Sequence, residues 1–275
     1  MPELPEVETM CRGIYPTIGK LIREVSQPPC GYRPIQIRPP VAEINARMAG
    51  CKVKAVTRLG KRVVIQTNDD SLILQPKMTG LVALESPPDP DHVRMQIDFN
   101  SKLRLQFWDR RGLGTVELIP TAELHERIVE GRLGPDALQI TVDDFIRRLQ
   151  ATARPIKVAL LDQKLLAGVG NLYASEMLFE AKIDPKKPAA KVSPARLRVL
   201  HQVMLDILQL AIKLEGSTLS DGTYRNAIND PGGYQNMHRV YDKAGEACRQ
   251  CQSTAILRIV QAQRSTFYCP KCQHK

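Results

Sequence analysis

Residues 1–9 of the chain read Met-Pro-Glu-Leu-Pro-Glu-Val-Glu-Thr. Removal of the initiator methionine leaves Pro2 with a free secondary amine, which can attack a sugar or carbonyl carbon and form a Schiff base. An α-amino group has a reference pKa of about 7.7–8.0, so part of it is neutral at physiological pH. Glu3 and Glu6 add proton donors beside it. The alternative is a plain helix start, with proline in the first turn and acids that favour the helix dipole.

The residues that follow predict a short helix and then many short strands. The helix covers 3–13, and the region from Gly19 to Glu117 is rich in β-forming residues. The predicted strands are 53–56, 62–66, 71–74, 81–84, 95–99 and 103–107. Many short strands separated by turns are typical of a β-sandwich or barrel.

The composition changes after about residue 121. Helical periodicity is found at 156–166, 172–181 and 193–214, and Thr141 has the sequence pattern of a helix N-cap. The segment 216–237 is rich in Gly, Asn, Asp and Ser, and we expect a long mobile loop there. Loops of that length are functional or disordered in most proteins.

Charge indicates a polyanionic partner. The chain has 275 residues, enough for two domains or one domain and a small module, and a net charge of +10. Basic residues gather at 52–62 and 248–275, and neither segment contains an acid. Such patches favour nucleic acid, although a solvated basic surface without a partner gives the same pattern.

The sequence predicts a soluble, intracellular protein. It has no run of 18 apolar residues, and its acidic beginning lacks the apolar stretch of a secretory signal. Cys11, Cys30 and Cys51 lie outside any paired motif, which argues against a disulfide scaffold and for a reducing compartment.

The C-terminal cysteines predict one structural zinc ion. Cys248 and Cys251 form one C-x2-C pair, and Cys269 and Cys272 form a second pair after 17 residues. Four thiolates fill a tetrahedral zinc site and leave no position for a catalytic water. Between the pairs, 256–260 and 264–268 alternate like the strands of a β-hairpin, which places Arg264 at its tip, where it could enter a DNA groove.

A glycine-rich turn precedes one of the predicted helices. Residues 168–173 read Gly-Val-Gly-Asn-Leu-Tyr. Glycines before a helix expose backbone N–H groups that bind phosphate, and predicted helices on both sides suggest a clamp on the DNA backbone. A tight turn without a ligand is the alternative.

Three distant segments, 2–9, 168–176 and 263–273, together resemble the formamidopyrimidine-DNA glycosylases. The resemblance extends over essentially the whole chain. Leu4 fits this branch better than the endonuclease VIII branch, which typically has glycine at that position.

The resemblance implies an α+β protein of three parts. These are an N-terminal β-sandwich with an N-terminal helix (1–120), a helical helix–two-turn–helix domain with a lesion-capping loop at 216–237 (121–247), and a β-hairpin zinc finger (248–275). It also implies a monomer that binds damaged double-stranded DNA in the bacterial cytoplasm, at the nucleoid, and has no membrane association.

The resemblance further implies roles for single residues. Pro2 is expected to attack C1′ of the damaged nucleotide, and Glu3 to donate the proton that opens the sugar. Lys61 is expected to bind phosphate and assist β-elimination, and Arg264 to grip phosphates and assist δ-elimination. Glu6 is expected to support the geometry of the site.

Six further positions match DNA-binding residues of the family. They are the backbone-binding positions His92, Lys157 and Asn171, and the void-filling positions Met78, Arg111 and Leu113. A base must leave the stack before its C1′ can be approached, and apolar or Arg wedges fill the hole. Met78 on its own would be interpreted as a core methionine.

Two departures from the family lie next to the wedge. Gln75-Pro76 stands where the family usually has His-Leu, and Leu113 stands where it usually has Phe. A smaller wedge stacks less well on bases. We therefore expect the catalytic chemistry to be kept, and the affinity or lesion preference to differ.

Three functions fit these observations. The first is a bifunctional glycosylase and AP lyase that removes 8-oxoguanine and formamidopyrimidines by β,δ-elimination. The second is the same chemistry directed mainly at oxidised pyrimidines or abasic sites. The third is a zinc-finger DNA-binding protein without catalysis, against which the pair Pro2-Glu3 counts.

Overall fold

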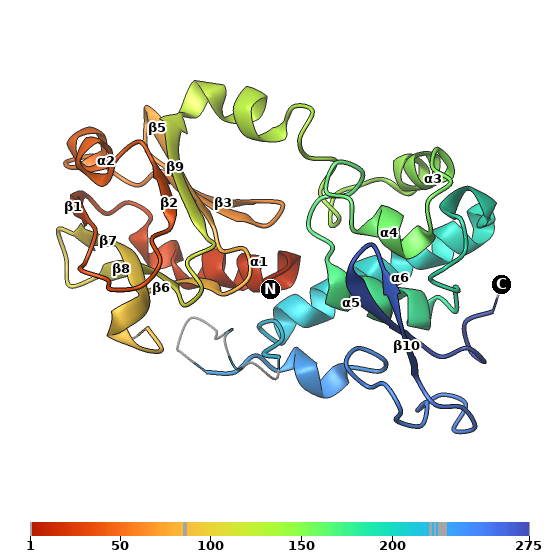
Figure 1. Ribbon diagram of the computed structural model, residues 1–275. Helices are drawn as coiled ribbons and strands as arrows, with labels where there is room; N and C mark the ends of the chain where they lie inside the picture. Colours follow the sequence, from red (N-terminus) through yellow and green to blue (C-terminus); the bar gives the residue numbers. More distant parts are fainter. Residues whose placement is uncertain (1, 85–86, 220–221, 223, 225–229, 275) are drawn as a thin grey trace. The chain divides into compact units, whose positions relative to one another are not determined.

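The computed structural model describes residues 2–84, 87–219, 222, 224 and 230–274. The chain divides into two compact units (Figure 1). The first contains Met1–Glu130 and Ile212–Gln235, and the second contains Gly131–Ala211 and Asn236–Lys275. The first unit therefore includes a segment that follows the helices of the second in the sequence.

Two β-sheets form the first unit within the described residues. The five-stranded sheet has the order β2 (Gln36–Arg38), β9 (Thr115–Pro120), β5 (Asp70–Gln75), β4 (Arg62–Gln66) and β3 (Ala55–Leu59). The four-stranded sheet has the order β1 (Ile22–Ser26), β7 (Val93–Phe99), β8 (Arg104–Asp109) and β6 (Gly80–Leu84). All neighbouring strands are antiparallel except β2 and β9.

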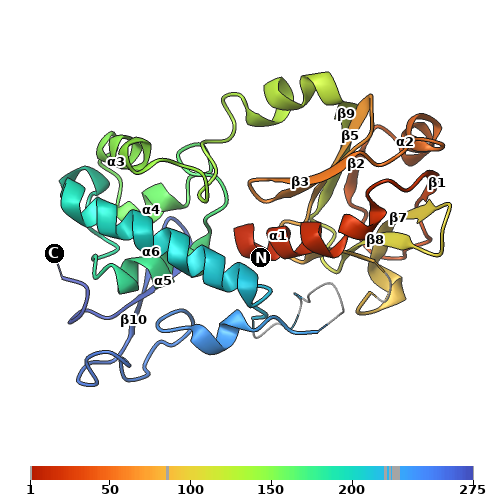
Figure 2. The same ribbon diagram turned by 180° about the vertical axis from the view of Figure 1, so that it is seen from behind.

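The core of this unit draws on both sheets and on helix α1 (Leu4–Gly13). Ile65 of β4, Phe107 of β8 and Val7 of α1 are all fully buried in one apolar cluster. Burying one such side chain contributes about 1.5–3 kcal/mol. Helix α1 packs on β3, β4 and β6, and Figure 2 shows it beside β3. The predicted β-sandwich with an N-terminal helix is confirmed.

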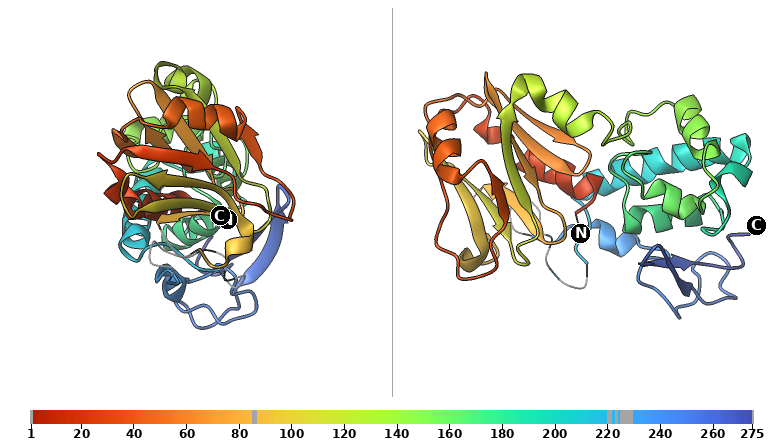
Figure 3. Two further views of the ribbon diagram at one scale, coloured as in Figure 1. Left: turned by 90° about the vertical axis from the view of Figure 1, so that its left-hand side faces the viewer. Right: turned by 45° about the horizontal axis from the view of Figure 1, so that its top comes forward.

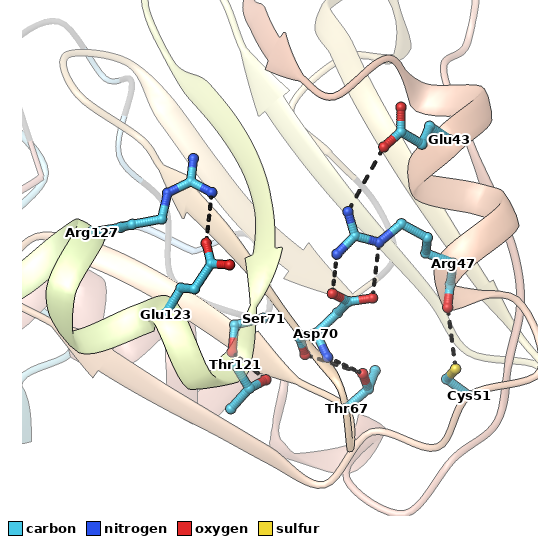
Figure 4. A network of polar contacts seen from close by, with 9 residues as sticks. All are labelled: Glu43, Arg47, Cys51, Thr67, Asp70, Ser71, Thr121, Glu123 and Arg127. Atoms are coloured by element: carbon cyan, nitrogen blue, oxygen red, sulfur yellow. Dashed lines mark hydrogen bonds and ion pairs between the residues drawn. The ribbon is translucent and has the colours of Figure 1, made fainter.

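Helix α2 (Val41–Met48) was not predicted, because the region 19–117 was assigned to strands. It has only 8 residues and follows two prolines, but Ile44 and Met48 place an apolar stripe on one face. Arg47 anchors it with a two-pronged contact to Asp70 at the start of β5, in which Nε donates to Oδ2 at 3.1 Å (Figure 4). Thr67 holds Asp70 in turn, because the backbone N–H of Asp70 donates to the Thr67 hydroxyl at 3.1 Å.

Helices dominate the second unit. They are α3 (Val142–Gln150), α4 (Ile156–Leu160), α5 (Asn171–Glu180) and α6 (Pro194–Lys213), the last of which ends in the first unit. Thr141 is the N-cap of α3, as predicted, and its hydroxyl accepts from the N–H of Asp144 at 3.3 Å. The helix predicted over 156–166 is shorter in the structure, where α4 ends at Leu160.

The remaining elements are short. The short helical turns are Tyr15–Thr17, Pro90–His92, Thr121–Glu123, His125–Val129, Ala189–Lys191 and Tyr234–Met237. The predicted C-terminal hairpin is confirmed as β10 (Leu257–Gln261) and β11 (Arg264–Tyr268), seen at the dark-blue end of the chain in the right-hand view of Figure 3. None of the described helices combines the length and the apolar character that crossing a membrane requires.

Candidate active site and nucleic-acid-binding elements

The first turn of α1 holds Pro2, Glu3 and Glu6 in a buried position. Glu3 is the N-cap residue and is only 4% exposed. Its backbone N–H donates to Glu6 Oε2 at 2.8 Å, and its own carboxylate accepts from the backbone N–H of Glu6. This reciprocal capping box fixes both acids directly beside Pro2. The structure thus brings together three of the predicted catalytic residues.

Glu6 also holds the segment that follows α6. Its Oε1 accepts from the N–H of Ser217 at 2.9 Å. Gly216 has a φ of +81°, and a Cβ there would lie 3.0 Å from both Glu6 Cγ and a ring carbon of Tyr224. The start of α1 and the start of the predicted lesion-capping loop are therefore neighbours in the first unit, with Glu6 between them.

The described residues of that loop close its base. Thr218 donates through its hydroxyl to Tyr224 O at 2.7 Å and accepts from the N–H of Gly232 at 2.9 Å. A Cβ at Gly232 would lie 2.4 Å from Gly216 O, so the two glycines allow a close backbone crossing. Burial raises the pKa of Tyr224 well above 10, and its hydroxyl donates to Glu215 O. Residues 220, 221, 223 and 225–229 lie outside the described residues.

Lys61 lies at the tip of the β3–β4 hairpin, in the turn between Leu59 and Arg62. Gly60, the first turn residue, has a φ of +56°. Arg58 joins this tip to α1, because its Nη1 donates to Gly60 O and its Nε donates to the carboxylate of Glu8, both at 3.1 Å. The lysine is therefore presented by a hairpin that is fixed to the helix that carries Pro2.

Asp109 organises the loop after β8. It is fully buried, and its Oδ1 accepts from the hydroxyl of Thr79 at 2.5 Å and from the N–H of Arg111 at 3.2 Å. Its Oδ2 accepts from the N–H groups of Leu113 and Gly114 at 2.8 and 2.7 Å. One carboxylate thus joins the β5–β6 turn to the loop 109–114.

The three predicted wedge residues lie on these two joined segments. Met78 is 38% exposed, Arg111 is exposed and Leu113 is half-buried. Sequence reasoning missed Asp109 as the residue that holds them. A signal was present, since an acid at a strand end before two glycines is typical of a loop closed by backbone N–H groups.

His92 lies in another part of the first unit. Its Nδ1 is 2.7 Å from Asp89 Oδ1, and its ring stacks on Tyr32 with centroids 4.2 Å apart. Burial raises the pKa of the Asp89 carboxyl, but the hydrogen bonds from His92 outweigh it and keep that pKa below the usual value. Gln75, the departure before Met78, accepts a hydrogen bond from the hydroxyl of Thr115 at 3.4 Å on the neighbouring strand.

In the second unit, Lys157 and Asn171 hold the zinc-finger hairpin. Lys157 is 1% exposed, and its ammonium donates to Asn171 Oδ1 at 2.8 Å and to Ser265 O and Thr266 Oγ1 at 2.9 Å. Asn171 Nδ2 donates to Ser265 O at 3.0 Å. Both side chains thus fix the residue next to Arg264, which is itself exposed at the start of β11.

Gln163 shapes the turn before α5, and sequence reasoning did not single it out. Its Oε1 accepts from the N–H of Gly168 at 3.0 Å, and its Nε2 donates to Val169 O at 2.9 Å. Gly168 has a φ of +106°, which only glycine adopts readily.

The four C-terminal cysteines converge as predicted. Their sulfur atoms all lie within 4.8 Å of one another. Cys248 Sγ and Cys272 Sγ are 3.8 Å apart, as are Cys251 Sγ and Cys269 Sγ. A tetrahedral zinc ion with Zn–S bonds of about 2.3 Å needs sulfur separations of about 3.8 Å, so the site fits zinc.

Family models match three consecutive parts of the chain. The formamidopyrimidine-DNA glycosylase N-terminal domain matches residues 1–116, and the formamidopyrimidine-DNA glycosylase H2TH domain matches 133–223. The zinc finger found in FPG and IleRS matches 245–275.

Whole proteins match over nearly their full length. The formamidopyrimidine-DNA glycosylase of Chloroflexus aurantiacus is 38% identical over 99% of this chain and 98% of the relative, and that of Thermus thermophilus is 37% identical over the same shares. Among solved structures, a Lactococcus lactis FPG mutant in complex with Fapy-dG-containing DNA has a TM-score of 0.89 at 31% identity and full coverage of both chains. Lactococcus lactis Fpg with abasic-site DNA has a TM-score of 0.88 at 32% identity over 99% of this chain and 100% of that chain.

Proposed function

Because the chain belongs to the formamidopyrimidine-DNA glycosylase family, we propose that it excises oxidised purines from double-stranded DNA and cleaves abasic sites through a Schiff base at Pro2. The observation that carries the proposal is the first turn of α1, where Glu3 and Glu6 are buried and cap each other beside Pro2. Binding without catalysis needs no buried acids beside a terminal amine.

The proposed reaction begins when the amine of Pro2, freed by removal of Met1, attacks C1′. Glu3 gives its proton to the ring oxygen, so that the sugar opens, and the damaged base leaves with the electrons of the glycosidic bond. The resulting iminium ion makes the neighbouring C2′ proton acidic. Loss of this proton expels the 3′ phosphate, and a second elimination expels the 5′ phosphate.

Lys61 and Arg264 act on the phosphates in this proposal. Lys61 is presented at the tip of a hairpin fixed to α1, where it binds phosphate and assists the first elimination. Arg264 is exposed on the zinc-finger hairpin and assists the second. Glu6 keeps the start of α1 attached to the loop that would cover a flipped base.

The remaining predicted residues bind and open the duplex. Met78, Arg111 and Leu113 fill the space that the extruded nucleotide leaves. Lys157 and Asn171 act by holding the hairpin that carries Arg264, and His92 contacts the DNA backbone. The net charge of +10 supports attraction to phosphates along the duplex.

The three functional parts are proposed as 1–120, 121–247 and 248–275, with one structural zinc ion in the last. The zinc would be held by the four cysteine thiolates and would stabilise the hairpin that presents Arg264. The protein is proposed to act as a monomer in the bacterial cytoplasm, where the chromosome lies.

Duplexes that each contain one lesion test the substrate. We expect strand scission at 8-oxoguanine, at a formamidopyrimidine and at an abasic site, with phosphate left at both ends of the gap, as β,δ-elimination requires. Scission mainly at thymine glycol would instead support the interpretation as an oxidised-pyrimidine enzyme. Binding of all duplexes without scission would contradict the proposal.

A further inference from the structure

Arg94 lies in a β-bulge and is buried. In the ladder between β7 and β8, Val93 pairs with Trp108 and Met95 pairs with Phe107, so Arg94 falls outside the register. Bulges redirect a side chain relative to its neighbours. Arg94 is only 2% exposed, which is rare for arginine.

The buried guanidinium lacks a carboxylate partner within the described part of the chain. Its Nε donates to the backbone oxygen of Asp109 at 2.8 Å, and its Nη1 lies 2.6 Å from Cys30 Sγ. Its Nη2 is buried and has no hydrogen-bond partner among the described residues. A buried charge without an anion is costly, so an acceptor atom next to the Cys30 sulfur, which already contacts Nη1, would give the guanidinium the partner that Nη2 lacks.

Cys30 lies half-buried in the segment between β1 and β2. Its thiol donates to Asp91 O at 3.0 Å. The same segment packs closely against the loop 109–114, here called the wedge loop, because a Cβ at Gly112 would lie 2.4 Å from Arg33 O. Cys30 therefore touches a buried cation on one side and belongs to a segment that contacts the loop 109–114.

We propose that Cys30 is a site of oxidation to a sulfenic acid by a hydroperoxide. The thiol gives up its proton as sulfur attacks one peroxide oxygen, the O–O bond breaks, and sulfur loses two electrons as the S–O bond forms. The other oxygen takes up that proton and leaves as water or an alcohol. The new oxygen accepts a hydrogen bond from Nη2 of Arg94, so the oxidised sulfur supplies the missing partner.

Oxidation at Cys30 would be transmitted to the wedge loop through Arg94. The guanidinium joins Cys30 to Asp109, whose carboxylate holds Arg111 and Leu113. Trp108, which precedes Asp109, is the single tryptophan of the chain and lies edge-on to His92. Its fluorescence reports on this cluster without any DNA.

The test uses the zinc-loaded full-length protein. It is treated with a small excess of hydrogen peroxide and then with dimedone, which labels sulfenic acids, and the labelled cysteines are identified by mass spectrometry of tryptic peptides. Cys51 is the matched control, because it is also half-buried. Among the described residues its thiol donates to Arg47 O at 3.3 Å, and the guanidinium of Arg47 is bound to Asp70 (Figure 4). We expect labelling of Cys30 to be about tenfold faster than that of Cys51. Equal labelling, or faster labelling of Cys51, would overturn the proposal.

Two variants test whether the reactivity of Cys30 depends on Arg94 and whether its oxidation reaches the wedge loop. Arg94→Lys keeps a cation but removes the second N–H group, and it should bring the labelling ratio close to one. If this variant does not fold, the wild-type comparison of the two cysteines still decides. Peroxide should change the Trp108 emission of the wild type but not of Cys30→Ser, and an equal change in both would refute the link from Cys30 to the wedge loop.

Discussion

At the residue scale, two buried carboxylates hold the backbone around the proposed site. Glu6 accepts from two N–H groups that are 214 positions apart in the chain, those of Glu3 and Ser217. Asp109 accepts from one hydroxyl and three N–H groups. Each hydrogen bond to a charged group contributes about 1.5–3 kcal/mol, so these acids determine where the neighbouring loops lie.

Asp109→Asn is predicted to lower the free energy of unfolding by about 1–3 kcal/mol, because an amide NH2 would face the N–H donors that now meet Oδ2. It should also weaken binding to lesion-containing duplexes, since the loop with Arg111 and Leu113 loses its anchor. Urea unfolding and duplex titration measure the two effects. Asp91→Asn, an exposed acid nearby, should stay within about 0.5 kcal/mol of the wild type. A stable Asp109→Asn protein with a normal affinity would show that the carboxylate is dispensable.

The buried His238 should lower the free energy of unfolding in weak acid. Burial, with a smaller effect from the charge of Lys243, lowers the pKa of His238 from 6.5 to about 4. The unfolded chain therefore binds a proton that the folded chain does not, and stability falls as pH drops from 6.5 toward 4. From pH 7 to pH 5 this one residue should cost about 2 kcal/mol.

Urea unfolding of His238→Gln at both pH values measures that cost by difference. The variant should lose less stability between pH 7 and pH 5 than the wild type does, by about 2 kcal/mol. His125→Gln changes an exposed histidine and should leave the wild-type pH dependence intact. Equal pH dependence in all three proteins would contradict the assigned titration.

At the element scale, the sequence predicts strands where β-forming residues stand in short runs between turns, and it does not reveal elements whose formation depends on tertiary contacts. β4 and β5 have Val, Ile and Leu in short runs between turns, so their existence followed from the sequence. α2 was missed because eight residues inside a strand-rich region give a weak helical signal. The turn between α4 and α5 depends on Gln163 and Gly168, whose contacts cannot be read from spacing.

The hairpin β10–β11 and helices α4 and α5 are joined by Lys157. Its ammonium donates to three uncharged acceptors, one on α5 and two on β11, none of which a sequence pattern identifies. A basic residue in a DNA-binding protein predicts a phosphate contact, whereas the structure places this one in the interior. Its burial therefore favours a role in supporting the hairpin over a direct phosphate contact.

Lys157→Met is predicted to loosen the hairpin, because Ser265 O and Asn171 Oδ1 lose a buried donor. The free energy of unfolding should fall by about 1–3 kcal/mol, and amide hydrogen exchange over 257–268 should accelerate. Lys164→Met, an exposed lysine in the turn before α5, is the control and should change neither. Unchanged exchange in Lys157→Met would show that the network does not hold the hairpin.

At the scale of the whole molecule, the proposed chemistry is divided between two units. The first carries Pro2, Glu3 and Lys61, and the second carries Arg264 and the cysteine site. Spacing alone predicted the cysteine site, the chemistry of the first residues pointed to Pro2 and Glu3, and likeness to the family added Lys61 and Arg264. The contact of Cys30 with Arg94 spans 64 positions and depends on a bulge, so no sequence pattern could reveal it.

Removal of zinc is predicted to unfold the C-terminal hairpin and abolish DNA binding. A small module held by four thiolates loses most of its folding free energy without the metal. Far-UV circular dichroism and duplex titration after chelation, and again after zinc is restored, measure this. Full strand scission by protein shown to be free of zinc would contradict the structural role of the metal.

Borohydride trapping on an 8-oxoguanine duplex tests the proposed nucleophile most directly. The account predicts a covalent protein–DNA adduct that peptide mapping places at the amine of Pro2. Pro2→Gly should lose most of the adduct, whereas Pro5→Ala, a buried proline in the same turn, should keep it. An adduct mapped to a lysine, or undiminished trapping by Pro2→Gly, would contradict the central claim.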